Sequence, residues 1–165
     1  MLQVITLISI AFLVALDQII KLLVIEYLEP IGSLPLLDGF IQLNYAENTG
    51  AAFGSFSSYT IILTVFTFVA VIAGIVLLLT QKIRFGVEYV CGAVIIAGGI
   101  GNLIDRVSRG FVIDYIEPLF IDFAIFNFAD ILVTCGAAVL IFWLIFDMIR
   151  ESKKEKEKQN EGIAD

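Results

Sequence analysis

The sequence predicts an all-α membrane protein with four transmembrane helices and a small sheet outside the membrane. Three observations support this fold class: an apolar composition, four long apolar stretches, and an alternating segment between the first two stretches. Of the 165 residues, 59% are hydrophobic and 16% are charged, and the mean hydropathy is +0.98. Soluble domains are about 45–50% apolar and about 25% charged, so this composition favours a membrane protein.

Each of the four apolar stretches is near or above the roughly 20 residues that a helix needs to cross the hydrocarbon core. They run from about Val4 to Tyr27, Tyr59 to Thr80, Gly86 to Ile104 and Phe123 to Met148. Backbone polar groups must be paired inside a bilayer, which favours helices. We expect residues 1–150 to form one integral-membrane domain. Residues 151–165 carry alternating charges and are expected to be a solvated tail in which the last helix frays.

The connection between the first two helices, about Leu28–Ser58, is too long for a tight turn. Prolines and glycines precede its alternating segment Phe40–Tyr45, which predicts a small strand or hairpin. The connection has no Lys or Arg, whereas five of the ten basic residues lie in the last sixteen positions. Basic residues mark the cytoplasmic side, so we expect both termini inside and the sheet outside. Arg106 and Arg109 oppose this rule, and a functional role would account for them.

The composition also excludes several classes of function. The chain has no histidine, which removes Ser–His and Cys–His nucleophile pairs and the common His-containing zinc sites. The basic residues form no face outside the tail, so no nucleic-acid partner is expected. Cys91 and Cys135 lie inside apolar stretches and are interpreted as packing residues. We expect no metal and no cofactor.

The polar residues of the apolar stretches gather at the outward ends of the first, third and fourth helices. Asp17 and Lys21 are four residues apart, so they share a helix face and can form an internal ion pair, which Gln18 can extend. Charged groups are costly within a bilayer and are therefore candidates for function. For Asp17 and Lys21 we favour a structural role over direct chemistry.

The third helix ends with a second polar face, formed by Asn102, Asp105 and Arg106. The glycines that precede it are interpreted as positions of close helix packing. No strand comes before them, so they do not fit a dinucleotide-binding loop. Arg109 can pair with Asp105 if the helix continues.

The remaining candidates lie on the third connection and at the start of the fourth helix. Asp114 lies on the connection, and Asn127 and Asp130 are three residues apart on one helix face. Two carboxyl groups that share one proton can act as general base and general acid on a peptide bond. The residue inventory therefore favours hydrolysis by paired carboxylates, and it leaves open which two of Asp105, Asp114 and Asp130 form the pair.

Five motifs in this order resemble those of one known family. They are Asp17-Gln18-x-x-Lys21, Asn48-x-Gly50-Ala51-Ala52-Phe53, Gly101-Asn102-x-x-Asp105-Arg106, Val112-Ile113-Asp114-Tyr115 and Phe126-Asn127-x-Ala129-Asp130. The chain resembles lipoprotein signal peptidase (signal peptidase II), a membrane aspartic peptidase of bacteria, over nearly its whole length except the tail. Tyr115 stands where the family often has Phe, and Ile113 where Val is usual.

The resemblance implies a four-helix bundle with an extracytoplasmic β-cradle and a short outer helix, in the cell membrane. It implies prolipoprotein substrates whose lipobox cysteine already carries diacylglycerol, with cleavage just before that cysteine near the outer face. Membrane lipid is then a partner, and no obligate protein partner is implied. Carried over by motif, Asp114 and Asp130 are the catalytic pair. The residues that line or support the site are Asn48, Asn102, Arg106, Asn127, Ala129, Asp17, Lys21 and Asp105.

Two other classes of function compete with this interpretation. A small proton- or ion-coupled transport subunit would use Asp17, Lys21, Asp105 and Asp130 as a relay. Such a relay requires polar groups through the depth of the membrane, whereas the cytoplasmic halves of the helices are apolar. A purely structural membrane subunit is the other alternative, and it leaves the clustered polar motifs without a role.

Overall fold

Four long apolar helices and a small sheet make up the fold. The computed structural model describes residues 1–50, 57–80, 83 and 85–161. Within this part, four helices are long and apolar enough to cross a membrane. They are α1 (Leu2–Leu23) with its π-helical continuation η1 (Val24–Leu28), α2 (Ser57–Leu79), α3 (Val87–Arg109) and α4 (Phe128–Glu161). The predicted four-span architecture is confirmed.

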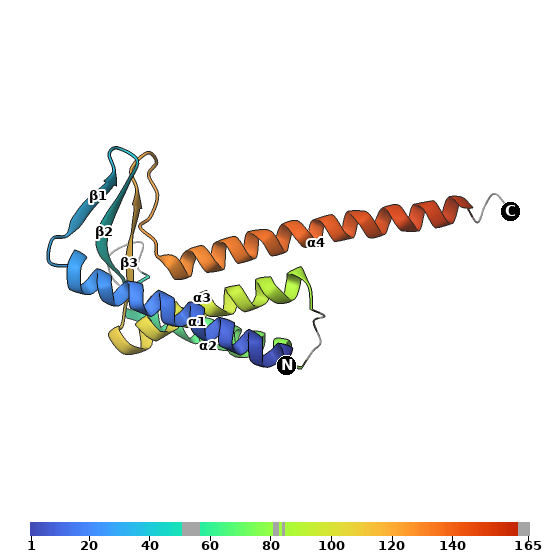
Figure 1. The fold of residues 1–165 in the computed structure, drawn as a ribbon, viewed down its shortest axis with the longest axis horizontal. Coiled ribbons are helices and arrows are strands. Elements are labelled where there is room, and N and C mark those ends of the chain that lie inside the picture. The colour runs from blue at the N-terminus through green and yellow to red at the C-terminus, as the bar shows by residue number, and fades with distance from the viewer. Residues whose placement is uncertain (51–56, 81–82, 84, 162–165) are drawn as a thin grey trace.

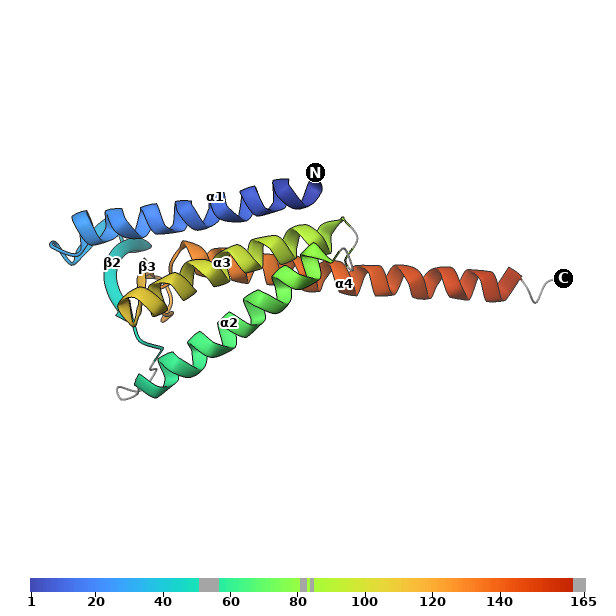
Figure 2. The same ribbon diagram turned by 90° about the horizontal axis from the view of Figure 1, so that it is seen from below.

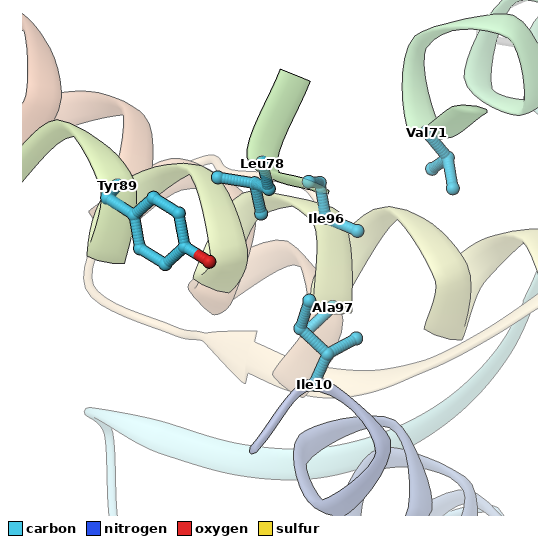
Figure 3. Packing of buried hydrophobic residues seen from close by; sticks show 6 residues of the cluster. All are labelled: Ile10, Val71, Leu78, Tyr89, Ile96 and Ala97. Atoms are coloured by element: carbon cyan, nitrogen blue, oxygen red, sulfur yellow. The ribbon is translucent and has the colours of Figure 1, made fainter. Parts of the chain in front are cut away.

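The helix α3 is central, because α1, α2 and α4 each pack against it (Figures 1 and 2). A buried apolar cluster joins α1, α2 and α3 (Figure 3); it contains Ile10, Val71, Leu78, Tyr89, Ile96 and Ala97. The outer faces of α1, α2 and α4 expose large apolar side chains such as Phe12 and Phe142. A bilayer is as apolar as these side chains, so their exposure fits a membrane-spanning bundle.

Small residues on α3 bring it close to its neighbours. A side chain at Gly98 would overlap the carbonyl oxygen of Ala129 and lie 2.8 Å from Val133 Cγ2, both on α4. A side chain at Gly101 would lie 2.5 Å from the carboxylate of Asp17 on α1. These glycines therefore permit close packing of helices, as the sequence predicts, and they let polar groups of α1 reach the start of α4.

A three-stranded antiparallel sheet lies at one end of the bundle (Figure 1). Its order is β1 (Ser33–Leu37), β2 (Ile41–Asn48) and β3 (Val112–Pro118). The N-terminus, the end of α2 and the start of α3 lie at the opposite end (Figure 2). The small sheet predicted from the alternating segment is thus confirmed, and the third connection supplies its last strand.

Element boundaries differ from the sequence prediction around this strand. The helix α3 continues to Arg109, and Gly110, with φ of 85°, ends it in the left-handed conformation that glycine adopts without strain. The helix α4 starts at Phe128, because Phe126 pairs with Ile116 as an extended chain. Residues 110–127 contain no helix, so the implied short outer helix is absent from this connection. Only nine residues separate Ile116 from Phe126, and they connect these two antiparallel segments.

The charged tail also differs from expectation, since α4 continues without a break to Glu161. Glu and Lys are strong helix formers, and oppositely charged residues three or four positions apart support a helix further. The tail therefore extends the last helix beyond the apolar part of the bundle (Figure 2), where fraying was expected.

The contact between α3 and α4 predicts a difference between two glycines of α3. Gly98→Ala should lower the free energy of unfolding by about 1–3 kcal/mol, because the methyl group forces the helices apart. Gly92→Ala is the matched control, since its methyl group would meet only Leu78 Cδ2 at an ordinary 3.6 Å, and alanine favours the helix. Thermal melts of both variants in detergent test this. Equal melting temperatures would show that the two helices are not in close contact at Gly98.

Candidate active site

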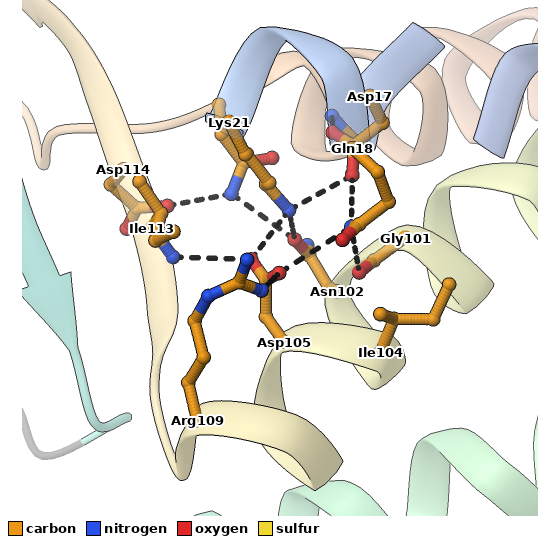
Figure 4. A network of polar contacts seen from close by, with 12 residues as sticks. Asp17, Gln18, Lys21, Gly101, Asn102, Ile104, Asp105, Arg109, Ile113 and Asp114 are labelled. Carbon is orange, nitrogen blue, oxygen red and sulfur yellow. Dashed lines mark hydrogen bonds and ion pairs between the residues drawn. The ribbon is translucent and has the colours of Figure 1, made fainter. Parts of the chain in front are cut away.

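Lys21 of α1 is the centre of a buried charge cluster between α1 and α3 (Figure 4). Its ammonium nitrogen lies 3.0 Å from Asp17 Oδ2 and 2.8 Å from Asp105 Oδ2, and it donates to Asn102 Oδ1 at 2.9 Å. Asp17, Lys21 and Asp105 are each 0% exposed. A lysine ammonium has three N–H donors, so every donor has an acceptor here. The ion pair predicted from the sequence is present, and Asp105 extends it.

Two further groups complete the charge cluster. Arg109 lies one turn beyond Asp105 and contacts its Oδ1 at 2.8 Å, because α3 continues as far as Arg109. Gln18 donates to Asp17 Oδ2 at 3.1 Å and to the carbonyl oxygen of Gly101 at 3.1 Å. Two carboxylates thus face two cations, and the cluster is neutral in formal charge. Charge balance of this kind is what permits ions to remain inside a membrane protein.

The same carboxylates hold the backbone of two other elements. Asp17 Oδ1 accepts the backbone N–H of Ala129 at 3.1 Å, in the first turn of α4. Asp105 Oδ2 accepts the backbone N–H of Ile113 at 3.2 Å, in β3. Ala129 immediately precedes Asp130, and Ile113 immediately precedes Asp114. The charge cluster therefore fixes the chain next to both carboxylates of the pair that the family resemblance implies.

Two asparagines connect the charge cluster to these carboxylates. Asn102 donates to Asp130 Oδ1 at 2.7 Å, while its own oxygen accepts from Lys21 and from Asn127. Asn127 donates to Asp114 Oδ1 at 2.6 Å and to Asn102 Oδ1 at 3.1 Å. Asn127 has no exposed surface. Each amide can thus serve as donor and acceptor at once, which brings Asp114 and Asp130 to one site.

Asp130 lies in the first turn of α4 and forms a reciprocal cap with Asn127. Its backbone N–H donates to Asn127 Oδ1 at 2.9 Å, and its Oδ2 accepts the backbone N–H of Asn127 at 3.1 Å. This is the geometry of a capping box, with Asn127 at the N-cap and Asp130 three residues later. A carboxylate is favoured near a helix N-terminus. Asn127 and Asp130, predicted to share a helix face, therefore lie at the start of α4 and cap it.

Asp114 is held by the sheet. In the register of β2 and β3, Asn48 is opposite Val112, so its side chain shares a face with Asp114 two residues further. Asn48 Nδ2 donates to Asp114 Oδ2 at 2.8 Å. The pKa of Asp114 is raised from 3.8 to about 6, chiefly by burial; the charge of Asp130 adds to this rise, and the hydrogen bonds from Asn48 and Asn127 oppose it. This carboxyl is only 2% exposed.

The motif that begins at Asn48 lies partly outside the described residues. Gly50, with φ of 75°, donates its N–H to Asn48 Oδ1 at 2.8 Å and so ends β2 in a tight turn. Only glycine adopts this backbone conformation without strain, which accounts for the residue type at this position. The next motif residues, 51–53, lie outside the described part of the chain.

Tyr115 is a site residue that the sequence reasoning noted only as a departure from the family. Its hydroxyl oxygen accepts the backbone N–H of Phe128 at 3.1 Å. The first N–H groups of α4 are thus bound by Tyr115 from β3, by Asp17 from α1 and by Asn127 of the cap. No local pattern reveals this role, because the two residues are joined only by the tertiary fold.

A cavity of about 350 Å³ adjoins this site, between α2, α3 and α4. Asp130, Asn102 and Arg106 line it, together with apolar residues such as Phe66 and Val133. Arg106 is half-buried and lines the same cavity as Asp130. Asp130 therefore faces a largely apolar cavity, whose lining includes the cation of Arg106. All ten predicted site residues lie in this region: Asp114, Asp130, Asn48, Asn102, Asp105, Arg106, Asn127, Ala129, Asp17 and Lys21.

The charge cluster predicts that loss of its cation is costly. Lys21→Met should lower the free energy of unfolding by about 3 kcal/mol or more, because it leaves two buried carboxylates without their shared partner. Arg109→Gln is the control: its contact with Asp105 is partly exposed, so it should cost no more than about 1 kcal/mol. Thermal melts in detergent compare the two. Similar losses in both variants would contradict a central role for Lys21.

The raised pKa of Asp114 predicts a pH-dependent stability. An ordinary aspartate has a pKa of 3.8, against about 6 for folded Asp114, so between these values the unfolded chain releases a proton that the folded chain keeps. The contribution of Asp114 to stability is therefore present below about pH 4 and is lost as the pH rises through about 6, by at most about 3 kcal/mol. Melting curves of the wild type and Asp114→Asn across this range check it. Parallel pH dependence in the two proteins would show that Asp114 does not titrate there.

Comparison with known proteins places the chain in a family. The family model described as signal peptidase (SPase) II matches residues 9–146. The chain is 44% identical to the lipoprotein signal peptidase of Caldanaerobacter subterraneus subsp. tengcongensis, over 83% of this chain and 93% of the relative. It is 36% identical to that of Clostridioides difficile, over 83% and 92%. Two solved structures of bacterial membrane enzymes are also similar. The first has a TM-score of 0.75 and 29% identity, over 87% of this chain and 88% of its own. The second has a TM-score of 0.72 and 30% identity, over 84% of this chain and 91% of its own. The chain belongs to the signal peptidase II family.

Proposed function

We propose that this peptidase is an aspartic endopeptidase that removes the signal peptide from diacylglyceryl-modified prolipoproteins, before the lipid-modified lipobox cysteine. The observation that carries the proposal is the placement of Asp114 and Asp130. Asn127 donates its side-chain amide N–H to the Asp114 carboxylate and its backbone N–H to the Asp130 carboxylate. Asp130 also lines a cavity among the transmembrane helices. The relatives supply the substrate class, since they are described as lipoprotein signal peptidases.

The two carboxyl groups lie in different environments. Asp114 is buried, with a raised pKa, so it is suited to hold a proton. Asp130 contacts backbone N–H at the start of α4, where negative charge is favoured. In aspartic peptidases, two carboxyl groups share one proton, because neighbouring like charges do not both ionise readily. As the groups titrate together, the protons belong to the pair.

The proposed reaction follows from this asymmetry. Asp130 takes a proton from a water molecule while the water oxygen attacks the scissile carbonyl carbon. Asp114 donates its proton to the carbonyl oxygen, which gives a neutral tetrahedral diol. Collapse of the diol returns a proton to Asp114 and transfers the proton from Asp130 to the leaving nitrogen, so the C–N bond breaks and the pair is restored. This is general acid–base catalysis by two groups with opposite tasks.

The remaining residues of the site have supporting roles in this proposal. Arg106 lines the cavity together with Asp130, so it is suited to bind the substrate backbone or lipid ester oxygens. Asn48 and Asn127 orient Asp114, and Asn102 orients Asp130. Lys21, Asp17 and Asp105 hold the backbone that precedes each catalytic residue. We place the site near the outer face of the cell membrane, with both termini in the cytoplasm, from the distribution of basic residues.

A proton- or ion-coupled transport role is less well supported. Its relay would need polar groups at successive depths, whereas Asp17, Lys21 and Asp105 are in direct contact with one another. Toward the opposite end of the bundle, the described residues that line the space between α2, α3 and α4 are apolar as far as Glu88. The cluster is therefore a single layer of charge, as a catalytic site requires.

The proposal is tested by incubating the purified protein with a diacylglyceryl-modified lipobox peptide and analysing the products by mass. Asp114→Asn and Asp130→Asn should each lower kcat by about a thousandfold or more, because an amide cannot alternate between acid and base. The double variant should be hardly worse than either single one, since the two groups act as a unit. Substrate affinity should survive in all three.

Asp105→Asn is the control that separates the candidate pairs. It should retain measurable turnover and lose stability instead, because Asp105 contacts Lys21, Arg109 and the backbone of Ile113. A fast Asp114→Asn variant together with an inactive, folded Asp105→Asn variant would make Asp105 and Asp130 the pair. Absence of cleavage by the folded wild type would overturn the proposed substrate.

A further inference from the structure

The cavity beside Asp130 continues toward the opposite end of the helices. A second cavity of about 650 Å³ lies between α2, α3 and α4, and it shares Ala70, Ile95 and Ile96 with the first. The residues of α3 that line the two cavities follow one helix face, from Glu88 through Gly92 and Gly99 to Arg106. A single groove therefore extends along α3 from the candidate active site to the start of this helix.

Glu88 ends this groove with a negative charge. Among the described residues that line the inner cavity, it is the only charged one, and its neighbours include Leu77, Ile83 and Leu144. Its Oε1 accepts the indole N–H of Trp143 on α4 at 3.2 Å. A carboxylate accepts about four hydrogen bonds, so this one hydrogen bond to the described part of the chain leaves capacity for a cation. The groove is thus apolar along its length and suited to a positive charge at its inner end.

The length of the groove matches a signal peptide. From Glu88 to Asn102, α3 advances by 14 residues, which corresponds to about 21 Å. A signal peptide has a basic n-region followed by an apolar h-region of about 7–15 residues before its cleavage site. As a helix, such an h-region spans up to about 22 Å. A signal peptide with its scissile bond at the carboxylate pair would therefore bring its basic n-region to Glu88.

We propose that Glu88 binds the basic n-region of the signal peptide and that Glu88 is a specificity-determining residue of this peptidase. The occupant of the groove is then the h-region, which packs as a helix against α2, α3 and α4. Glu88 selects substrates by charge and by the distance between that charge and the cleavage site. The inference rests on the proposed function for the identity of the substrate, and its test is independent of cleavage.

Trp143 provides the measurement, since the chain contains one tryptophan and its N–H contacts Glu88. The full-length Asp114→Asn protein in detergent is titrated with diacylglyceryl lipobox peptides that carry Lys, Gln or Glu 14 residues before the cleavage site. Binding is followed by Trp143 fluorescence. The Lys peptide should bind most tightly, with an affinity about three- to tenfold above that of the Gln peptide, as expected for a half-buried ion pair. A Lys moved by seven residues should lose this advantage.

Variants of Glu88 distinguish the effect of its charge on peptide binding from the effect of its hydrogen bond to Trp143. Glu88→Gln keeps an acceptor for Trp143 and removes only the charge, so it should bind the Lys and Gln peptides equally. Glu88→Lys should prefer the Glu peptide. Asp147→Asn is the matched control, because Asp147 is on α4 near the same end but is not among the residues that line the groove; it should leave the preference unchanged.

Each result decides the inference. Equal affinity of the Asp114→Asn protein for the three peptides overturns the inference. An equal loss of affinity for all three peptides in Glu88→Gln also overturns it, because that result would indicate a structural role of Glu88 or a groove that holds lipid. Charge-dependent binding without cleavage by the wild type would leave the inference standing and overturn the proposed reaction. Cleavage by the wild type without charge-dependent binding would support the proposed reaction and overturn the inference about Glu88.

Discussion

The buried ammonium of Lys21 is the interaction on which the site depends. It lies between two carboxylates that have no exposure to solvent, and removing it would leave both charges without compensation inside the bundle. The cost of burying these ions is high, and it is offset only because every donor and acceptor has a partner. These contacts join α1 to α3 at the level of the site.

Both carboxylates of the cluster also bind a backbone N–H elsewhere. Asp17 holds the start of α4 and Asp105 holds the start of β3, which are the two elements that carry Asp130 and Asp114. The position of the proposed catalytic pair is therefore supported by Asp17, Lys21 and Asp105. These three residues do not line the cavity themselves. A catalytic arrangement needs this kind of rigid support, because small displacements of the reacting groups reduce the rate strongly.

The site combines a membrane bundle with a sheet for a physical reason. A helix start has N–H groups without intrahelical partners, and within a membrane these must be satisfied by protein. At the start of α4 they are bound by Asp17, Tyr115 and Asn127, which come from a helix, a strand and the cap. The strand thus completes the helix and at the same time delivers Asp114. The contacts of Asp17, Tyr115 and Asn127 therefore stabilise the start of α4 and also position the proposed carboxylate pair.

The sequence alone determined the four helices, the small sheet and the ion pair of Asp17 and Lys21. These follow from apolar length, from alternation and from helical spacing, which are local properties. Only the tertiary structure shows that Asn127 contacts the carboxylates of both Asp114 and Asp130, since the register of β2 and β3 and the contacts of Asn127 join residues far apart in the chain. It likewise decided the start of α4, because Phe126 pairs with β3, and the role of Tyr115. Such long-range pairings leave no periodic signal in the sequence, and they depend on how the elements pack.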